Sequence, residues 1–257
     1  MTERPLALIT GASGGLGLDL ARCAARDGYD VVLTARSRAS LETAADEIAS
    51  RYRVTTSVIA DDLADPAAPA RILASIERPL DVLVNNAGFG SWGPFAESDP
   101  AGIAGMIGVN VTALTLLSRL ALPGMLKRGR GGILNVASVA GFLSGPHLAV
   151  YYATKNYVVA LTEALGEEVA GTDVTVTALC PGPVATGFQE RAGVHVSRLK
   201  ERTMMDSATC AEAGWKGFRS GHQLVIPGAG NRLLTFSPRL LPRRLMTHIV
   251  GRAQGPS

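Results

Sequence analysis

A glycine-rich stretch directly follows the first apolar run of the chain. Residues 6–10 read LALIT, residues 10–17 read TGASGGLG, and an Ala/Leu-rich periodic segment occupies residues 16–25. A strand, turn and helix of this kind present free backbone N–H groups and the positive end of a helix dipole to a diphosphate, which the glycines let approach closely. The Gly-Lys-Ser/Thr ending of a P-loop is missing, which favours a dinucleotide site. Taken alone, a tight turn without a ligand is the alternative.

The first two thirds of the chain alternate short β-branched runs with longer periodic segments. Between the runs, apolar residues recur every three or four positions, as in Leu41, Ala45 and Ile48, which lets a helix cover one face of a sheet. The alternation predicts an α/β fold with one doubly wound parallel sheet of about seven strands, a Rossmann fold. The predicted strands are 6–10, 31–35, 54–60, 82–85, 133–137, 174–180 and 224–226.

We expect a single domain over residues 1–257, because no repeat, low-complexity run or Ser/Gly linker divides the chain. Residues 187–215 interrupt the pattern with scattered apolar residues, and we predict a helical, mobile substrate lid there rather than another β-α unit. Met204 and Met205 belong either to that lid or to ordinary packing.

Residues 228–257 form a basic C-terminal extension. Residues 213–257 hold seven Lys and Arg and no Asp or Glu, although the whole chain has a net charge of only +3. The mixture of arginines with leucines in RLLPRRL at 239–245 suits a neighbouring subunit, the rim of the substrate pocket or, less favoured, an anionic membrane surface. We expect no nucleic acid partner, since no stacking platform or binding motif accompanies the arginines.

Composition fits a folded protein in a reducing compartment. The chain is 47% apolar and 18% charged, enough for a sizeable core. Cys23, Cys180 and Cys210 form no CxxC pair and have no clustered His partners, so neither a disulfide framework nor a metal site is expected. The first apolar run is too short for a signal peptide, and polar residues interrupt the uncharged window 131–154. We therefore expect a cytoplasmic protein without a transmembrane segment.

The residue that follows the second predicted strand indicates which dinucleotide binds. Folds that prefer NAD place an Asp or Glu there for the ribose 2′-hydroxyl, whereas this chain has Arg36, with Arg38 beyond it. A guanidinium can bind a 2′-phosphate through charge-assisted hydrogen bonds, and an acid would repel that phosphate. We predict NADP(H) in preference to NAD(H), the alternative being two solvated arginines.

A tyrosine and a lysine in YYATK, residues 151–155, are suited to proton transfer. Tyr151 and Lys155 are four residues apart and share one helix face, whereas Tyr152 is turned aside by about 100°. Tyrosine has a pKa near 10, and a lysine cation beside it favours the phenolate. The pair can therefore move the proton that accompanies a hydride.

Other polar residues follow predicted strands. Ser138 ends a strand thirteen residues before Tyr151, and NNAG follows the fourth strand at 85–88. Carboxyl ends of parallel strands face the ligand crevice, so both are expected there. Asn110 would be out of place in the middle of a helix unless its side chain is hydrogen-bonded. His147 is expected to be a loop residue without a catalytic role.

Together and in this order, TGASGGLG, NNAG, the serine, YxxxK and Pro181-Gly182 leading to Thr186 resemble the short-chain dehydrogenase/reductase (SDR) family over about residues 5–190. The resemblance implies a seven-stranded doubly wound sheet and a catalytic set of Asn110, Ser138, Tyr151 and Lys155. It assigns Tyr151 as the acid/base and Ser138 as the hydrogen-bond donor to the substrate oxygen. It also implies that Lys155 bonds the nicotinamide ribose and that Asn110 holds a water that relays protons.

The same resemblance implies the cofactor contacts. Asp62 and Leu63 would meet the adenine, and Val184 and Thr186 would hold the nicotinamide amide. Gly14 stands where many NADP-preferring members carry a basic residue, which leaves Arg36 and Arg38 to select the cofactor. The predicted cofactor-binding residues are Gly11, Ser13, Gly15, Leu16, Gly17, Arg36, Asp62, Leu63, Asn86, Ala87, Gly88, Tyr151, Lys155, Pro181, Val184 and Thr186.

We therefore predict an NADP(H)-dependent oxidoreductase that transfers hydride between nicotinamide and a carbonyl or secondary alcohol of a fairly apolar small molecule. Reduction is the expected direction, and a homodimer or homotetramer is the expected assembly. The alternatives are an NAD(H)-dependent alcohol dehydrogenase of the same family and a dinucleotide sensor or scaffold without turnover. A methyltransferase on a similar sheet would leave YxxxK unexplained. The substrate is not specified by the sequence.

Overall fold

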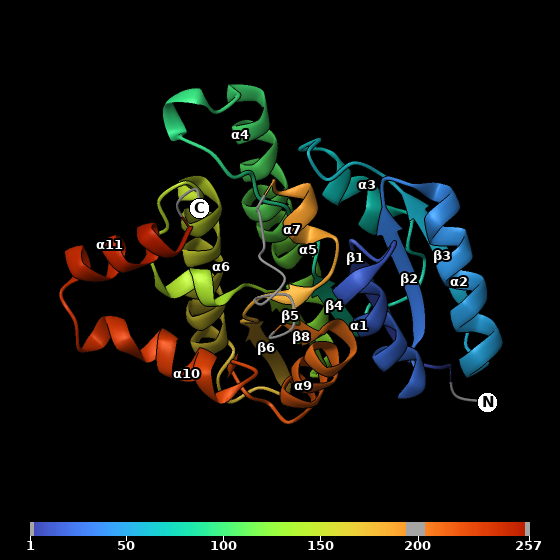
Figure 1. Ribbon diagram of the computed structural model, residues 1–257. Helices are drawn as coiled ribbons and strands as arrows, with labels where there is room; N and C mark the ends of the chain where they lie inside the picture. The colour runs from blue at the N-terminus through green and yellow to red at the C-terminus, as the bar shows by residue number, and fades with distance from the viewer. Residues whose placement is uncertain (1–2, 194–203, 255–257) are drawn as a thin grey trace.

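Seven parallel strands form the central sheet of the protein (Figure 1). The computed structural model describes residues 3–193 and 204–254. The strand order is β3-β2-β1-β4-β5-β6-β9, so the predicted doubly wound sheet is confirmed. The largest shift from the predicted strand ends is two residues, at the starts of β3 and β5. The strands are β1 (Leu6–Thr10), β2 (Asp30–Ala35), β3 (Thr56–Ala60), β4 (Val82–Asn85), β5 (Gly131–Val136), β6 (Val174–Leu179) and β9 (Leu224–Val225).

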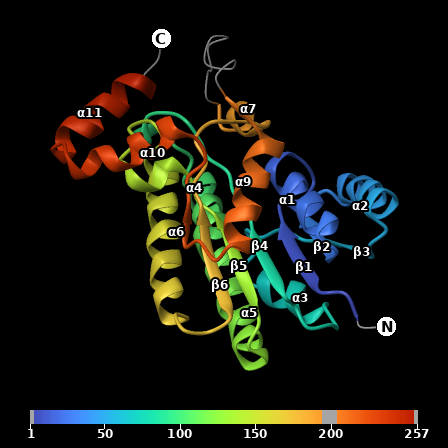
Figure 2. The same cartoon turned by 90° about the horizontal axis from the view of Figure 1, so that it is seen from below.

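Helices cover both faces of this sheet because alternate strand residues pack in opposite directions. In β1, Ala7 and Ile9 belong to one buried cluster, and Leu6 and Leu8 belong to another. The first cluster includes α1 (Gly15–Arg26), α2 (Arg38–Tyr52) and α9 (Ser207–Arg219). The opposite face is covered by α3 (Ala68–Ala74), α5 (Leu114–Arg128) and α6 (Ala149–Glu168) (Figure 2).

Shorter elements complete the described chain. A small parallel pair is formed by β7 (Val184–Ala185) and β8 (Met205–Asp206). The other helices are α4 (Pro100–Ile107), α7 (Phe188–Arg191), α10 (Ala229–Phe236) and α11 (Arg243–Gln254). Tight turns of 3₁₀ helix occupy Phe95–Glu97, Val139–Phe142 and Ser237–Arg239, and a π-helical turn, Gly108–Ala113, joins α4 to α5.

The helical run Pro100–Arg128 is apolar and long enough to cross a membrane by length and composition, with a mean hydropathy of 1.6. Leu117 and Met125 of this run are buried against the sheet, which explains part of its apolar composition. A helix that covers a sheet meets the same criterion, so the hydropathy alone does not indicate a membrane span. The window 131–154 instead contains β5, a 3₁₀ turn and the start of α6.

The prediction of a lid over residues 187–215 is wrong for its second half. Residues 207–215 belong to α9, which packs against α1 as one of the helices that cover the sheet. Trp215 is fully buried, meets the Tyr29 ring edge-on and donates from Nε1 to Asp27 Oδ2 at 2.8 Å. Residues 194–203 of the expected lid lie outside the described residues. In α9, glycines and alanines occupy closely packed positions, so the sequence shows only a weak helical repeat of large apolar residues.

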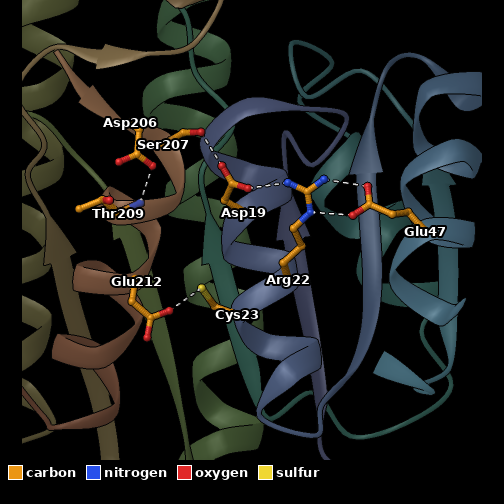
Figure 3. A network of polar contacts seen from close by, with 8 residues as sticks. All are labelled: Asp19, Arg22, Cys23, Glu47, Asp206, Ser207, Thr209 and Glu212. Atoms are coloured by element: carbon orange, nitrogen blue, oxygen red, sulfur yellow. Dashed lines mark hydrogen bonds and ion pairs between the residues drawn. The ribbon is translucent and has the colours of Figure 1, made fainter. Parts of the chain in front are cut away.

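Polar bonds fix α1 to both of its neighbouring helices (Figure 3). Arg22 forms a two-point bond with Glu47 of α2, Nε to Oε1 at 2.9 Å and Nη2 to Oε2 at 2.7 Å. Arg22 Nη1 also donates to Asp19 at 2.7 Å, and Asp19 accepts a further bond from the Ser207 hydroxyl of α9. The buried Asp19 carboxylate accepts hydrogen bonds from Arg22, which also binds α2, and from Ser207 of α9. These bonds fix the position of α1 relative to both helices.

The strand order reverses at β1, which pairs with β2 on one side and β4 on the other. The connections after β1 and β4 therefore lead to opposite faces of the sheet and leave a crevice at the carboxyl ends of these strands. The TGASGGLG turn and the NNAG residues border that crevice, which brings together two motifs that are about seventy residues apart in the sequence.

Candidate active site

A cleft of about 2380 Å³ is lined by the residues that follow β1 to β6. Every sequence-predicted cofactor-binding residue lines it, and so does Ser138. The exception in the predicted catalytic set is Asn110, which is fully buried beneath the NNAG loop. The fold therefore brings the candidate residues into one continuous site.

The glycine-rich turn leaves the first backbone N–H groups of α1 available to a ligand. Gly14 precedes the helix with extended backbone and gives no side-chain cap, and the first turn of α1 contains no acidic residue. Gly15 has a left-handed φ of 53°, and a Cβ there would lie 3.3 Å from the Thr186 side chain across the cleft. An uncapped helix start facing a narrow gap fits a diphosphate.

Thr10 and Asn86 hold this turn against the end of β4. Thr10 Oγ1 accepts from the backbone N–H groups of Asn86 and Ala87, both at 2.9 Å. Asn86 Nδ2 donates to the carbonyl oxygens of Thr10 at 2.9 Å and Gly11 at 3.2 Å. These bonds draw the two backbones so close that a Cβ on Gly17 would overlap the Gly11 carbonyl oxygen and the Asn86 amide.

The two candidate 2′-phosphate residues differ in position. Arg36 is exposed and lines the cleft next to β2. Arg38 is in the first turn of α2, does not line the cleft and lies 3.7 Å from Glu42 Oε1. Of the two arginines, only Arg36 therefore stays a candidate for contact with a 2′-phosphate.

The candidate adenine pocket is formed by the loop after β3. Leu63 is buried and lines the cleft beside Asp62. Asp61 anchors the loop, since its carboxylate accepts from the Asp62 N–H at 2.8 Å and from Arg71 Nη2 of α3 at 2.8 Å. The loop thus presents an apolar side chain and backbone groups at the end of the cleft.

Tyr151 lies on the cleft wall at the start of α6, with its ring 5.3 Å from the Phe188 ring of α7. Burial raises the pKa of Tyr151 to about 12, although a hydrogen bond with the Ser138 side chain opposes that rise. The phenol therefore keeps its proton at neutral pH, and the influence of Lys155 on the pKa of Tyr151 stays a prediction.

Lys155 is buried one helical turn further along α6. Its Nζ donates to the Val136 carbonyl oxygen of β5 at 2.7 Å and lies 5.8 Å from the centre of the Tyr151 ring. Burial lowers the pKa of Lys155 to about 8, with the nearby Cys180 raising it slightly. The ammonium therefore predominates at neutral pH and has N–H groups to spare for a ligand in the cleft.

Asn110 joins the NNAG loop to the catalytic helix from within the π-helical turn. Its Oδ1 accepts from Phe89 N at 3.0 Å, and its Nδ2 donates to Phe89 O at 2.9 Å and to Thr154 Oγ1 at 3.1 Å. Thr154 in turn donates to the Tyr151 carbonyl oxygen at 2.7 Å. Both amide hydrogens are used within the protein, so the side chain positions the loop against α6.

The substrate end of the cleft includes residues that the sequence reasoning did not single out. Trp92 stacks on His147 at 5.6 Å between ring centres and donates from Nε1 to the Gln254 carbonyl oxygen at 3.0 Å. Gln254 Nε2 also donates to the Tyr152 hydroxyl. Trp92 follows NNAG closely enough to have been suspected, whereas no sequence signal connects Gln254 with this site.

The C-terminal helix forms one wall of this substrate end. Met246 and Val250 of α11 are buried with Leu143, Leu148 and Tyr152, and Ile249 lines the cleft. Shielding of the pocket was one of three expectations for the basic extension, and the packing of α11 supports it. Among the described residues, no three His, Cys, Asp or Glu side chains gather closely enough to hold a metal ion.

Comparison with known proteins identifies the same scaffold. Residues 5–195 match the family model for short chain dehydrogenase. Ketoacyl reductase HetN of Nostoc sp. is 35% identical over 195 residues, which is 75% of this chain and 68% of that protein. The short-chain dehydrogenase of Sphingobium yanoikuyae, solved with NADPH, is 30% identical with a TM-score of 0.82 and covers 98% of this chain and 99% of its own.

Similar structures also hold the other cofactor. A short chain dehydrogenase/reductase from Burkholderia phymatum in complex with NAD is 26% identical, with a TM-score of 0.78, and covers 98% of this chain and 96% of its own. The cleft described above fits either nicotinamide dinucleotide, because the uncapped start of α1, the Leu63 pocket and the Lys155 ammonium are common requirements of both.

Gly17 and Gly14 provide a matched test of the dinucleotide turn. We expect Gly17→Ala to weaken NADPH binding at least about tenfold, because its Cβ would overlap backbone and push the turn away from β4. Gly14→Ala should lose less affinity than Gly17→Ala, since a Cβ there meets no protein atom within 4 Å, although Gly14 also lines the cleft. Calorimetric titration measures both affinities, and equal affinities would show that the close approach at Gly17 is not needed for binding.

Proposed function

The chain belongs to the short chain dehydrogenase family, and on that premise we propose that it is an NADP(H)-dependent reductase of apolar carbonyl compounds in the cytoplasm. Its relatives are oxidoreductases that act on carbonyl or alcohol groups with NAD(P). The NADP(H) preference, the apolar substrate and the reductive direction are the parts that are specific to this proposal.

The observation that carries the proposal is the hydrogen-bonded pair of Tyr151 and Ser138, which lines the same cleft as Lys155 and the glycine-rich turn. A bound nicotinamide would supply the hydride. Ser138 would donate a hydrogen bond to the carbonyl oxygen of the substrate, and the Tyr151 hydroxyl would give that oxygen its proton. Reduction is the direction that we propose, because relatives such as ketoacyl reductase HetN are named as reductases.

The residues around Tyr151 keep this proton donor in position. Phe188 covers the tyrosine ring and reduces its contact with water. Lys155, held on the Val136 carbonyl, has free N–H groups that can bind ribose hydroxyls, and Asn110 fixes the neighbouring loop to α6. A pure dinucleotide sensor would need neither a tyrosine nor a serine at this point.

Selection of NADP(H) rests on Arg36. Its guanidinium lies at the cleft beside the end of β2, and no described acidic side chain lies within ion-pair distance of it. A ribose 2′-phosphate could bind this guanidinium without breaking an existing ion pair.

Arg36 and Arg38 are a natural pair for testing cofactor choice. We expect Arg36→Ala to weaken NADPH binding about ten- to a hundredfold, the usual loss for a hydrogen bond to a charged group, and to leave NADH binding unchanged. Arg38→Ala should alter neither affinity, because Arg38 is turned to Glu42. Titration of each variant with both cofactors measures this, and parallel losses for NADPH and NADH would mean that Arg36 does not read the phosphate.

Tyr151→Phe tests the reaction itself. We expect turnover to fall about 10²- to 10⁴-fold while NADPH still binds, because the ring remains and only the proton donor is lost. Tyr157→Phe, on the exposed side of the same helix, should keep full activity. Turnover is followed at the nicotinamide absorbance with a panel of apolar ketones and aldehydes, and full activity of Tyr151→Phe on a turned-over substrate would refute the mechanism.

An apolar substrate is supported by the side chains around the catalytic pair. The cleft beyond Tyr151 is lined by Trp92, Leu143, Leu148, Phe188 and Met204. Aromatic and aliphatic walls with a few polar groups at the reacting carbon suit a carbonyl compound with a hydrocarbon body.

We further propose a homo-oligomer that associates through α5 and α6. Leu116, Leu120 and Leu126 of α5 are exposed, and Tyr157 of α6 lies beside them with its hydroxyl 3.0 Å from Thr115 Oγ1. Exposed large apolar side chains on adjoining helices are typical of a surface that is covered by a second copy.

Leu120 provides the test of this assembly. We expect Leu120→Asp to reduce the solution mass from a dimer or tetramer to smaller species, because it would bury a charge in an apolar contact. Leu120→Met should keep the wild-type mass. Gel filtration with light scattering measures both, and a wild-type mass equal to one chain would contradict the proposal.

A further inference from the structure

The C-terminal arm, residues 229–254, exposes an unusual density of large apolar side chains. Leu233 and Leu240 are each 71% exposed, the largest fractions among the exposed large hydrophobic side chains of the described residues. Soluble surfaces rarely collect such residues without a partner. The full set on the arm is Leu233, Leu234, Phe236, Leu240, Leu241, Leu245 and Ile249.

Arginines are interleaved with these apolar residues. Phe236 lies beneath the Arg239 guanidinium at 5.7 Å, and Arg243 and Arg244 directly precede Leu245. In the ranges 3–193 and 204–254, no acidic side chain forms an ion pair with an arginine of the arm. The sequence after residue 212 contains no Asp or Glu at all. The arm therefore combines apolar side chains with positive charge that is not neutralised.

The arm is also placed where a large flat partner can reach it. In Figures 1 and 2, α10 and α11 lie at the end of the molecule opposite α2. One side of α11 is fixed to the body by the buried Met246 and Val250, and its end is tied to Trp92 and Tyr152 through Gln254. Leu245 and Ile249, four residues apart on another side of α11, remain exposed.

We propose that the C-terminal arm docks this enzyme on an anionic membrane surface. Apolar side chains would enter the region between headgroups and acyl chains, and the arginines would bind anionic headgroups. A second copy of the chain fits less well, because a symmetric contact would set arginines against arginines with no acidic residue of the arm to neutralise them.

The cleft supports the same orientation. Leu234 and Ile249 belong to the exposed set of the arm and also line the cleft, as do Val250 and Arg252. A bilayer against the arm would therefore lie beside the substrate end of the cleft. An apolar substrate could then pass between lipid and protein with little exposure to water. This docking does not depend on the cofactor or on the direction of the reaction.

Vesicle sedimentation of the full-length protein tests the proposal. We expect the wild type to pellet with phosphatidylglycerol-rich vesicles and not with phosphatidylcholine vesicles. Leu233→Ser/Leu240→Ser and Arg243→Glu/Arg244→Glu should each weaken binding about tenfold or more, the first by removing apolar insertion and the second by reversing charge. Arg51→Glu/Arg53→Glu makes the same charge change at the α2 end and should leave vesicle binding close to that of the wild type.

The controls separate docking from folding and from self-association. All variants should keep the wild-type affinity for NADPH, since none of the substituted residues lines the cleft. Absence of vesicle binding by the wild type, equal binding to both lipids, or equal losses in the α2 control and the arm variants would overturn the proposal. It would also be overturned if the arm variants lowered the solution mass while the wild type bound no vesicles, because the arm would then be a contact between copies.

Discussion

The close approach of the glycine-rich turn to the end of β4 is the constraint on which the rest of the site depends. The side chains of Thr10 and Asn86 form the hydrogen bonds that hold the turn and the end of β4 together, where the two backbones are not paired as strands. Residue 17 must be glycine, because a Cβ there would overlap the Gly11 carbonyl oxygen and the Asn86 amide. The approach fixes the start of α1 beside the crevice at the strand-order reversal. It also places the NNAG loop where Asn110 can bind it to α6, so hydrogen bonds connect the candidate cofactor turn with the helix that carries Tyr151.

Burial governs the chemistry of the catalytic pair in a way that residue spacing does not reveal. Four-residue spacing correctly places Tyr151 and Lys155 on one side of α6, both facing the cleft. The same low-polarity surroundings act oppositely on the two groups, raising the pKa of Tyr151 to about 12 and lowering that of Lys155 to about 8. The lysine Nζ donates to the Val136 carbonyl oxygen and keeps further N–H groups for a ligand in the cleft. A protonated phenol and a neighbouring cation are the states that the proposed reduction requires.

The sequence predicted the parts of the fold in which local pattern and tertiary packing agree. The seven strands are alternating or continuous apolar runs with a glycine, a proline or a polar residue at the end or within the next two positions, and the predicted cofactor-binding residues all line one cleft. Prediction failed where small residues conceal a helical period, as in α9, whose Ala211, Gly214 and Gly217 give a weak apolar signal although they pack tightly. It could not distinguish Arg36 from Arg38, because Glu42 reaches Arg38 only once α2 has formed. It also could not connect Gln254 with Trp92, since their contact joins segments about 160 residues apart.

These contacts divide the chain into a part that holds the candidate catalytic and cofactor-binding residues and a C-terminal part that covers the cleft. The family match ends at residue 195, and all the candidate cofactor-binding and catalytic residues precede that point. The wall of the cleft that α11 forms and the arginine-rich arm come after it, held to the body by a small set of buried side chains and by Gln254. Substitutions in the arm can therefore change which molecules reach Tyr151 without disturbing the bonds that position it. On the two proposals made here, such a scaffold would keep one reaction while its C-terminal segment sets where, and on what, that reaction takes place.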